Sequence, residues 1–208
     1  MTTIIYKNGI MASDTRTTAR TSVHSKVHCL HCGEKECGYD TTVKIVAPFG
    51  DEEKAKFRGE PIYAMAFSGT VSWGDSMIEM LSQGEDVEAF NNRAAKALGT
   101  SPSQTGSVMI ATTTSVYIYC PYRQHRDEKV RQYPLDTPKV LTLGSGGRYA
   151  YAAATAGKLS AVEAVGAAGQ CDKSTSLVVK WVDCKDHSKK EIQTTDFTGQ
   201  VPLDYFPE

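Results

Sequence analysis

The chain has 208 residues, 40% of them hydrophobic, and a formal net charge of −1. This length and apolar content suffice for one substantial core, and the near-neutral charge gives no electrostatic reason to expect nucleic acid or an anionic membrane as a partner. No apolar run is long enough to span a bilayer, and the first residues lack the apolar core of a signal peptide. We therefore expect a single cytoplasmic domain over residues 1–208.

The first residues predict a tight β-hairpin. Asn8-Gly9 is the strongest two-residue hairpin signal, and β-prone residues flank it on both sides. With this pair as the turn, Thr3 lies opposite Asp14. The register places the Asp14 carboxylate at the open end of the hairpin, near the start of the chain, although contact with Thr2 itself needs a bend.

Thr2 is the candidate nucleophile. Met1 followed by a small residue is the usual context for removal of the initiator methionine, so Thr2 is expected to carry a free α-amino group. One N-terminal threonine then supplies both a hydroxyl nucleophile and an amine base. The unperturbed pKa of that amine, about 7.7–8.0, leaves part of it neutral near pH 7.

Beyond the hairpin, the periodicity predicts blocks of strands, each followed by a pair of helices. We expect strands over 42–48, 61–68, 106–112, 115–120, 139–143, 175–183 and 189–195. We expect helices over 72–83, 85–98, 147–157 and 160–171. Ser160 and Glu163 form a capping box at the start of the last helix, and the charged segment 123–131 is interpreted as a solvated hairpin tip. This order favours an α+β protein with sheets stacked face to face and helices outside.

Four segments of the chain carry a family resemblance. They are Thr2-Thr3-Ile4-Ile5 with Ala12-Ser13-Asp14-Thr15-Arg16, then Thr42-Val43-Lys44-Ile45-Val46, Ala66-Phe67-Ser68-Gly69-Thr70 and Leu143-Gly144-Ser145-Gly146-Gly147. In this order they resemble proteasome β-type subunits, especially the bacterial proteasome-like protease HslV. The hairpin is shorter than in HslV by the same amount on both sides of its turn, which preserves the alternation of its side chains. The resemblance implies the four-layer αββα sandwich of the N-terminal-nucleophile hydrolases.

The resemblance also implies the catalytic roles. Thr2 is the nucleophile, Lys44 lowers the pKa of its hydroxyl, and Asp14 holds Lys44 charged and in place. Lys44 interrupts an apolar run, where a charge needs a partner; a solvated lysine on an edge strand is the alternative. The Gly69 N–H matches the family's oxyanion donor, with an ordinary turn glycine as the alternative.

Three further residues match supporting positions of the family. Ser145 corresponds to a serine near the terminal amine. Asp172 and Thr175 resemble the D-x-x-S support site, with threonine in place of serine.

A Cys- and His-rich insertion at about residues 22–40 departs from the family pattern. Its candidate zinc ligands are Cys29, Cys32, Cys37 and His28, with His24 as a substitute for the histidine. A polar loop with reduced thiols is the alternative. The remaining cysteines, expected in the core, are Cys120, Cys171 and Cys184. Catalysis itself is expected to need no cofactor.

The leading hypothesis is a self-compartmentalising threonine peptidase that hydrolyses polypeptide substrates inside a homo-oligomeric ring. An ATP-dependent unfoldase partner is compatible with the resemblance, whereas neither nucleic acid nor a membrane is expected as a partner. Two alternatives stay open. One is a catalytically silent ring or binding subunit that retains Met1, and the other is an N-terminal-nucleophile amidohydrolase that acts on a small amide.

Overall fold

The computed structural model describes residues 2–20, 36–39, 44–47, 54–69, 71–84, 106–120, 130–172, 175–187 and 191–198. Within these ranges the chain combines helices with antiparallel sheets, so the predicted α+β class is confirmed. The expected helix over 85–98 lies outside the described residues.

The first sheet has five strands in the order β11-β1-β2-β12-β13. Its strands are β1 (Ile4–Lys7), β2 (Ile10–Asp14), β11 (Leu141–Leu143), β12 (Val178–Asp183) and β13 (Gln193–Asp196). The hairpin pairs as predicted, with Lys7 opposite Ile10. Asn8 and Gly9 both have positive φ, 54° and 92°, as a two-residue type I′ hairpin turn requires.

The second sheet has six strands, ordered β10-β9-β8-β7-β5 with β6 paired to β7 beside this path. Its strands are β5 (Ile45–Val46), β6 (Lys56–Phe57), β7 (Glu60–Gly69), β8 (Gly106–Thr112), β9 (Ser115–Tyr119) and β10 (Val130–Pro134). The sequence predicted neither β6 nor β10. Both are edge elements, in which the apolar alternation that marks a half-buried strand is weak.

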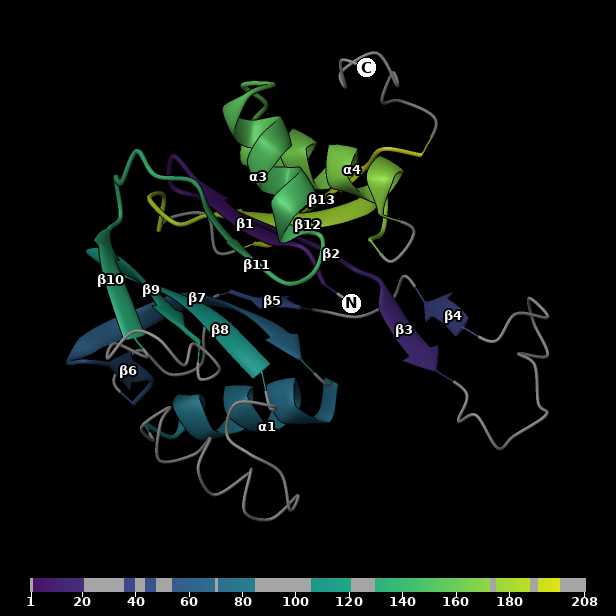
Figure 1. The fold of residues 1–208 in the computed structure, drawn as a ribbon. Helices are drawn as coiled ribbons and strands as arrows, with labels where there is room; N and C mark the ends of the chain where they lie inside the picture. Colours follow the sequence, from purple (N-terminus) through teal and green to yellow (C-terminus); the bar gives the residue numbers. More distant parts are fainter. Residues whose placement is uncertain are drawn as a thin grey trace.

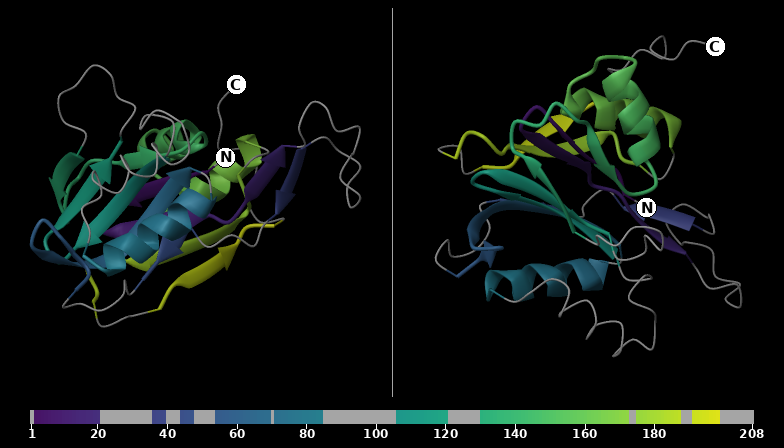
Figure 2. Two further views of the ribbon diagram at one scale, coloured as in Figure 1. Left: turned by 90° about the horizontal axis from the view of Figure 1, so that it is seen from below. Right: turned by 60° about the vertical axis from the view of Figure 1, so that its left-hand side comes forward.

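Helices lie on the outer sides of the two sheets. They are α1 (Val71–Ser82), α3 (Gly147–Thr155) and α4 (Ala161–Cys171). Figure 1 and the right-hand view of Figure 2 show α3 and α4 over one face of the first sheet. The second sheet lies across the opposite face, and α1 lies beyond it. No helix in the described ranges is long and apolar enough to cross a membrane.

The alternation of side chains along the hairpin creates two cores. One face of β1 and β2 packs against the second sheet, through a cluster that includes Ile4, Tyr6, Met11, Ala66 and Met109. The other face packs against α3 and α4, through a cluster that includes Ile5, Ala12, Ala150, Ala164 and Val165. The small alanine side chains let both helices approach the sheet closely, and the hairpin is therefore buried on both faces.

A short ladder lies outside the two sheets. β3 (Thr17–Arg20) continues the chain just beyond β2 and pairs with β4 (Glu36–Tyr39), projecting from the body in Figure 1. The sequence predicted no strands here, because each is short and polar and the two are separated by a long stretch of sequence. β3 directly precedes the Cys- and His-rich insertion, and β4 lies within its last residues.

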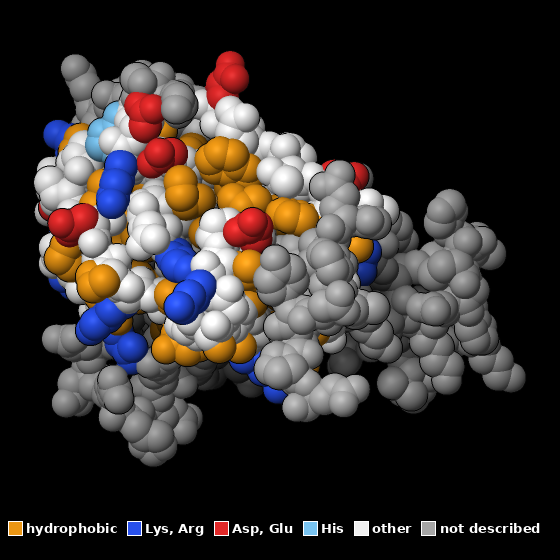
Figure 3. All heavy atoms as spheres, turned by 90° about the horizontal axis from the view of Figure 1, so that it is seen from above, with side chains coloured by type: hydrophobic (Ala, Val, Ile, Leu, Met, Phe, Trp, Pro, Cys, Tyr) orange, Lys and Arg blue, Asp and Glu red, His pale blue; other side chains and the backbone are white. Residues whose placement is uncertain are grey.

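The face that carries α3 and α4 mixes acidic, basic and apolar side chains (Figure 3). Tyr151 of α3 is half exposed on the surface of the molecule. Cys171 corrects an expectation, because this last residue of α4 is exposed, whereas Cys120 and Cys184 are buried as expected. Apolar neighbours in the sequence do not determine whether the last residue of a helix faces the core or the solvent.

The capping box predicted for α4 is present. The Ser160 hydroxyl accepts the Glu163 N–H, and the Glu163 carboxylate accepts the Ser160 N–H at 2.9 Å. The Ser160 hydroxyl also donates to the Glu163 carboxylate at 2.7 Å, and this bond, together with the one from the Ser160 N–H, lowers the pKa of Glu163 below its ordinary value of 4.5. The ionised carboxylate therefore stabilises the folded chain above pH 4.5, and this contribution is lost as the pH falls through the lower folded pKa.

We expect Ser160→Ala to lower the free energy of unfolding by about 1 kcal/mol at pH 7, because it removes the cap. The loss should shrink as the pH falls through the pKa of Glu163. Urea denaturation at a series of pH values measures this, with the exposed Thr194→Ala as the control. A loss that does not change between pH 7 and pH 3 would contradict the assignment.

Candidate active site

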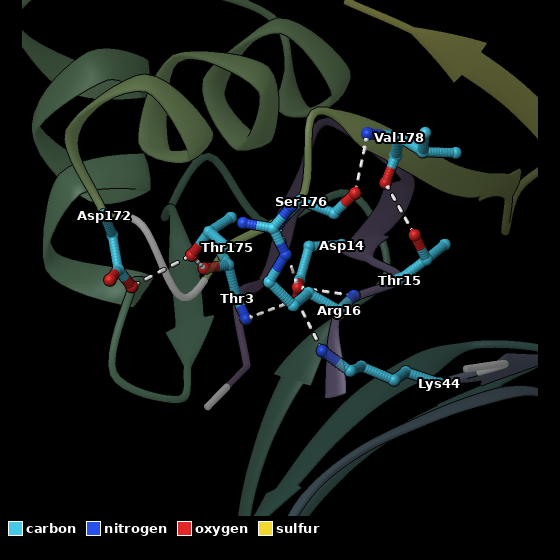
Figure 4. Close-up of polar contacts among 9 residues, drawn as sticks. All are labelled: Thr3, Asp14, Thr15, Arg16, Lys44, Asp172, Thr175, Ser176 and Val178. Carbon is cyan, nitrogen blue, oxygen red and sulfur yellow. Dashed lines mark hydrogen bonds and ion pairs between the residues drawn. The ribbon is translucent and has the colours of Figure 1, made fainter. Parts of the chain in front are cut away.

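The Asp14 carboxylate, at the end of β2, is the centre of a buried polar group (Figure 4). Its Oδ1 accepts the Thr3 N–H at 2.7 Å and the Lys44 ammonium at 2.8 Å. Its Oδ2 accepts the Arg16 N–H at 3.0 Å and the Ser176 N–H at 3.3 Å. Four donors therefore surround one carboxylate and leave both of its oxygens satisfied.

The Lys44–Asp14 ion pair connects the two sheets. Lys44 directly precedes β5 of the second sheet, where its carbonyl accepts the Phe67 N–H at 3.2 Å, while Asp14 belongs to the first sheet. The exposed fraction is 3% for Lys44 and 0% for Asp14. Charges buried this deeply are tolerated only when they are paired and hydrogen-bonded. The sequence expectation that Lys44 needs a partner is thus met, and the solvated alternative is wrong.

The open end of the hairpin has the predicted register. The Asp14 N–H donates to the Thr3 carbonyl at 3.1 Å, so the two residues face each other as the turn requires. The carboxylate reaches the Thr2–Thr3 peptide through the Thr3 N–H.

A second polar group lies on the other side of Thr3. The Thr3 and Thr175 hydroxyl oxygens are 2.7 Å apart, and the Thr175 hydroxyl donates to Asp172 Oδ2 at 3.0 Å. Asp172 follows the last residue of α4, and Thr175 lies in the connection to β12. The structure therefore brings together the two residues of the D-x-x-T pattern and joins them to Thr3 (Figure 4).

The glycine turn before α3 closes over Thr2. The Gly146 N–H donates to the Thr2 carbonyl at 3.3 Å, and Gly144 has a φ of +83°. A Cβ atom at Gly144 would lie 1.9 Å from the Thr2 carbonyl oxygen, so only glycine fits there. Ser145, between the two glycines, is exposed. Thr2 itself is 6% exposed.

Gly69 lies where the sequence placed it, at the junction of a strand and a helix. It ends β7, opposite Gly106 of β8, and α1 begins at Val71. Among the described residues, no hydrogen bond joins Gly69 to the group around Asp14. Its role as an oxyanion donor stays a prediction.

Sequence reasoning missed three contributors to this site. Thr3 was treated only as the residue opposite Asp14, although that register was itself the signal that could have found it. Arg16 and Ser176 contribute main-chain N–H groups to Asp14, and a main-chain donor leaves no trace in residue type.

The zinc hypothesis stays untested. Cys29, Cys32, His28 and His24 lie outside the described residues, and the position of the Cys37 side chain in β4 is likewise not described. In the ranges the structure covers, no group of three or more His, Cys, Asp or Glu residues is arranged to hold a metal ion. Burial raises the pKa of the Cys184 thiol, which therefore stays protonated at neutral pH and is a poor nucleophile.

No family model and no curated protein matches the sequence. Solved structures do match. The Anbu complex of Pseudomonas aeruginosa, a helical assembly, is 17% identical with a TM-score of 0.54, covering 87% of this chain and 79% of its own. BPH of Thiobacillus denitrificans is 20% identical with a TM-score of 0.50, covering 87% and 95%. HslV of Trypanosoma brucei is 12% identical with a TM-score of 0.47, covering 94% and 98%.

The fold is proteasome-like. At these identities the likeness to Anbu and BPH extends to the fold alone. The predicted resemblance is confirmed at this level, and the polar group described above surrounds the open end of the first hairpin of that fold.

We expect Asp14→Asn to lower the free energy of unfolding by about 3–5 kcal/mol, because it removes the carboxylate that pairs with the buried Lys44 ammonium. The double variant Asp14→Asn/Lys44→Met lacks that charge and should recover part of the loss. Urea denaturation of both variants measures the effect. A cost for Asp14→Asn of less than about 1 kcal/mol, typical of a surface pair, would show that the pair is not buried in solution.

We expect Gly144→Ala to destabilise the fold more than Gly59→Ala. Both glycines have positive φ, so both substitutions carry the backbone cost of about 1–2 kcal/mol. A Cβ at Gly59 meets nothing within 4 Å, whereas at Gly144 it meets the Thr2 carbonyl. Chemical denaturation of the two variants isolates the clash, and equal losses would mean that the turn does not press on Thr2.

Proposed function

We propose that this protein is a threonine-type peptidase with the four-layer αββα architecture of the N-terminal-nucleophile hydrolases. The observation that carries the proposal is the buried Lys44–Asp14 pair, hydrogen-bonded to the Thr2–Thr3 peptide at the open end of the hairpin. In this proposal the Lys44 ammonium of the pair is the fixed positive charge that acts on the Thr2 hydroxyl. The proteasome-like fold adds support, since the neighbours in that fold are N-terminal-nucleophile hydrolases.

In the proposed reaction, Thr2 is the first residue after removal of Met1. Its hydroxyl oxygen attacks the carbonyl carbon of the scissile peptide while its α-amine takes the hydroxyl proton. The amine then returns the proton to the leaving nitrogen as the C–N bond breaks, which leaves an ester on Thr2. Water hydrolyses that ester and restores the hydroxyl.

The surrounding residues have supporting roles in this proposal. The Lys44 charge favours the alkoxide form of Thr2, and Asp14 keeps Lys44 charged and oriented. The Gly69 N–H stabilises the oxyanion, and Ser145 lies near the terminal amine. Asp172 and Thr175, at the end of α4 and just after it, help to hold Thr2 in place through the hydrogen bond of Thr175 to Thr3.

We also propose that the chain forms a homo-oligomer in the cytoplasm that encloses its sites and acts on unfolded polypeptides. The support is the assembly named for one structural neighbour, the helical Anbu complex. An ATP-dependent unfoldase would supply such substrates. Analytical ultracentrifugation tests the assembly, and a monomer at micromolar concentration would argue against it.

One observation favours a second candidate, a catalytically silent subunit. Thr2 is 6% exposed, and the glycine turn lies directly on its carbonyl, so little of this residue faces solvent. A chain that retains Met1 would keep its amine blocked. Hydrolysis of a small amide rather than a peptide is the further alternative.

Intact mass and activity together distinguish these functions. We expect a mass lower than that of the full sequence by one methionine residue, and hydrolysis of unstructured peptides. Thr2→Ala should lower kcat at least about 1,000-fold, whereas Thr2→Ser, which keeps a hydroxyl, should retain part of the activity. The exposed Thr194→Ala serves as the control.

Three other outcomes count against a peptidase that uses Thr2 as its nucleophile. Full retention of Met1 without hydrolysis would favour the silent subunit. Cleavage of small amides but not of peptides would favour the amidohydrolase. If Met1 is removed and Thr2→Ala still cleaves peptides at the normal rate, the nucleophile is wrongly assigned.

A further inference from the structure

Thr3 contributes both its N–H and its hydroxyl to the site, although it is not the nucleophile. It is fully buried, at 0% exposed. Its N–H donates to Asp14 Oδ1 at 2.7 Å, and its hydroxyl oxygen lies 2.7 Å from that of Thr175. Thr3 is thus hydrogen-bonded both to Asp14, which pairs with Lys44, and to Thr175, which donates to Asp172.

The direction of the hydroxyl chain follows from proton counting. The Thr175 hydroxyl has one proton and donates it to Asp172 Oδ2 at 3.0 Å. Its oxygen must then accept, so the proton between the two threonines belongs to Thr3. The chain runs from Thr3 to Thr175 to Asp172 and ends on a carboxylate, an acceptor that strengthens the bonds leading to it.

The peptide that joins Thr2 to Thr3 is held on both sides. Its carbonyl accepts the Gly146 N–H at 3.3 Å, and its N–H donates to Asp14. A Cβ at Gly146 would lie 1.9 Å from the Thr3 hydroxyl oxygen and 2.6 Å from that of Thr175. The turn therefore leaves no room for the Thr3 side chain to shift toward it.

We propose that Thr3 is a positioning residue, whose hydroxyl, anchored through Thr175 on Asp172, fixes the Thr2–Thr3 peptide and thereby the direction in which Thr2 presents its hydroxyl and amine. This inference rests on the proposed peptidase function. Thr3 joins the Asp14–Lys44 pair to the Asp172–Thr175 pair, so that both pairs help to hold the Thr2–Thr3 peptide in one orientation. Small errors in the placement of a reacting group are costly, about 100-fold in rate for 1 Å.

Thr3→Val and Thr3→Ser separate this role from simple packing. Valine keeps the shape and loses the hydroxyl, so we expect kcat for peptide hydrolysis to fall about 10- to 100-fold while KM stays within about twofold. Serine keeps the hydroxyl and should recover most of the activity despite its missing methyl group. If Thr3 only fills space, valine should be the better replacement, and that order would overturn the proposal.

Thr175→Val tests the same chain from outside β1, and it carries the test if Thr3→Val fails to fold. We expect a similar loss of kcat. The double variant Thr3→Val/Thr175→Val should lose no more, because each single substitution already breaks the same hydrogen bond between the two hydroxyls. Fully multiplicative losses would overturn the proposal. Thr194→Val, on the exposed part of β13, is the matched control and should leave kcat unchanged.

Hydrogen exchange provides a readout that does not need activity. In Thr175→Val we expect the Thr3 amide to exchange about tenfold faster than in the wild type, while the amides of β8 keep their rates. If the wild type hydrolyses no peptide, the proposed function fails and this measurement still decides on Thr3. An unchanged exchange rate at Thr3 would overturn the positioning role, whatever the activity.

Discussion

The buried ion pair between Lys44 and Asp14 is the interaction on which the site depends. It joins residues of different sheets, so the two sheets must stack in one relative position for it to form. Removing such a pair from water costs several kcal/mol per charge, and the attraction repays this only with good geometry and with every remaining acceptor filled. Three main-chain N–H groups donate hydrogen bonds to the remaining acceptor positions of the Asp14 carboxylate. The pair therefore specifies the geometry more than it adds stability.

The second constraint is steric and comes from the glycine turn before α3. Gly144 and Gly146 approach Thr2 and Thr3 so closely that no side chain fits between them. The turn and the carboxylate thus hold opposite sides of the same peptide. Both are brought there by antiparallel pairing of β1 with β11 and β2, with β12 pairing to β2 in turn. A site made from the start of the chain is in this way fixed by the centre of a sheet.

The local parts of this arrangement could be predicted from the sequence, and the long-range parts could not. Asn8-Gly9 gave the hairpin register, because turn chemistry sets pairing over a few residues. The burial of Lys44 followed from its apolar neighbours. The hydrogen bond of Ser176 to Asp14 spans 162 positions and uses a main-chain donor, so it cannot be predicted from the residue type. Short edge strands such as β10 were missed, since their burial is partial and their pattern weak.

In the proposed mechanism one residue, Thr2, combines a nucleophilic hydroxyl with a free amine. A peptide that ends in an epoxyketone carries two adjacent electrophilic centres, which suit such a residue. Incubation with this reagent, followed by peptide mapping in a mass spectrometer, locates the adduct. We expect a single adduct, on Thr2 of chains that lack Met1, and none in Thr2→Ala. An adduct on another residue, or none on chains that begin with Thr2, would contradict it.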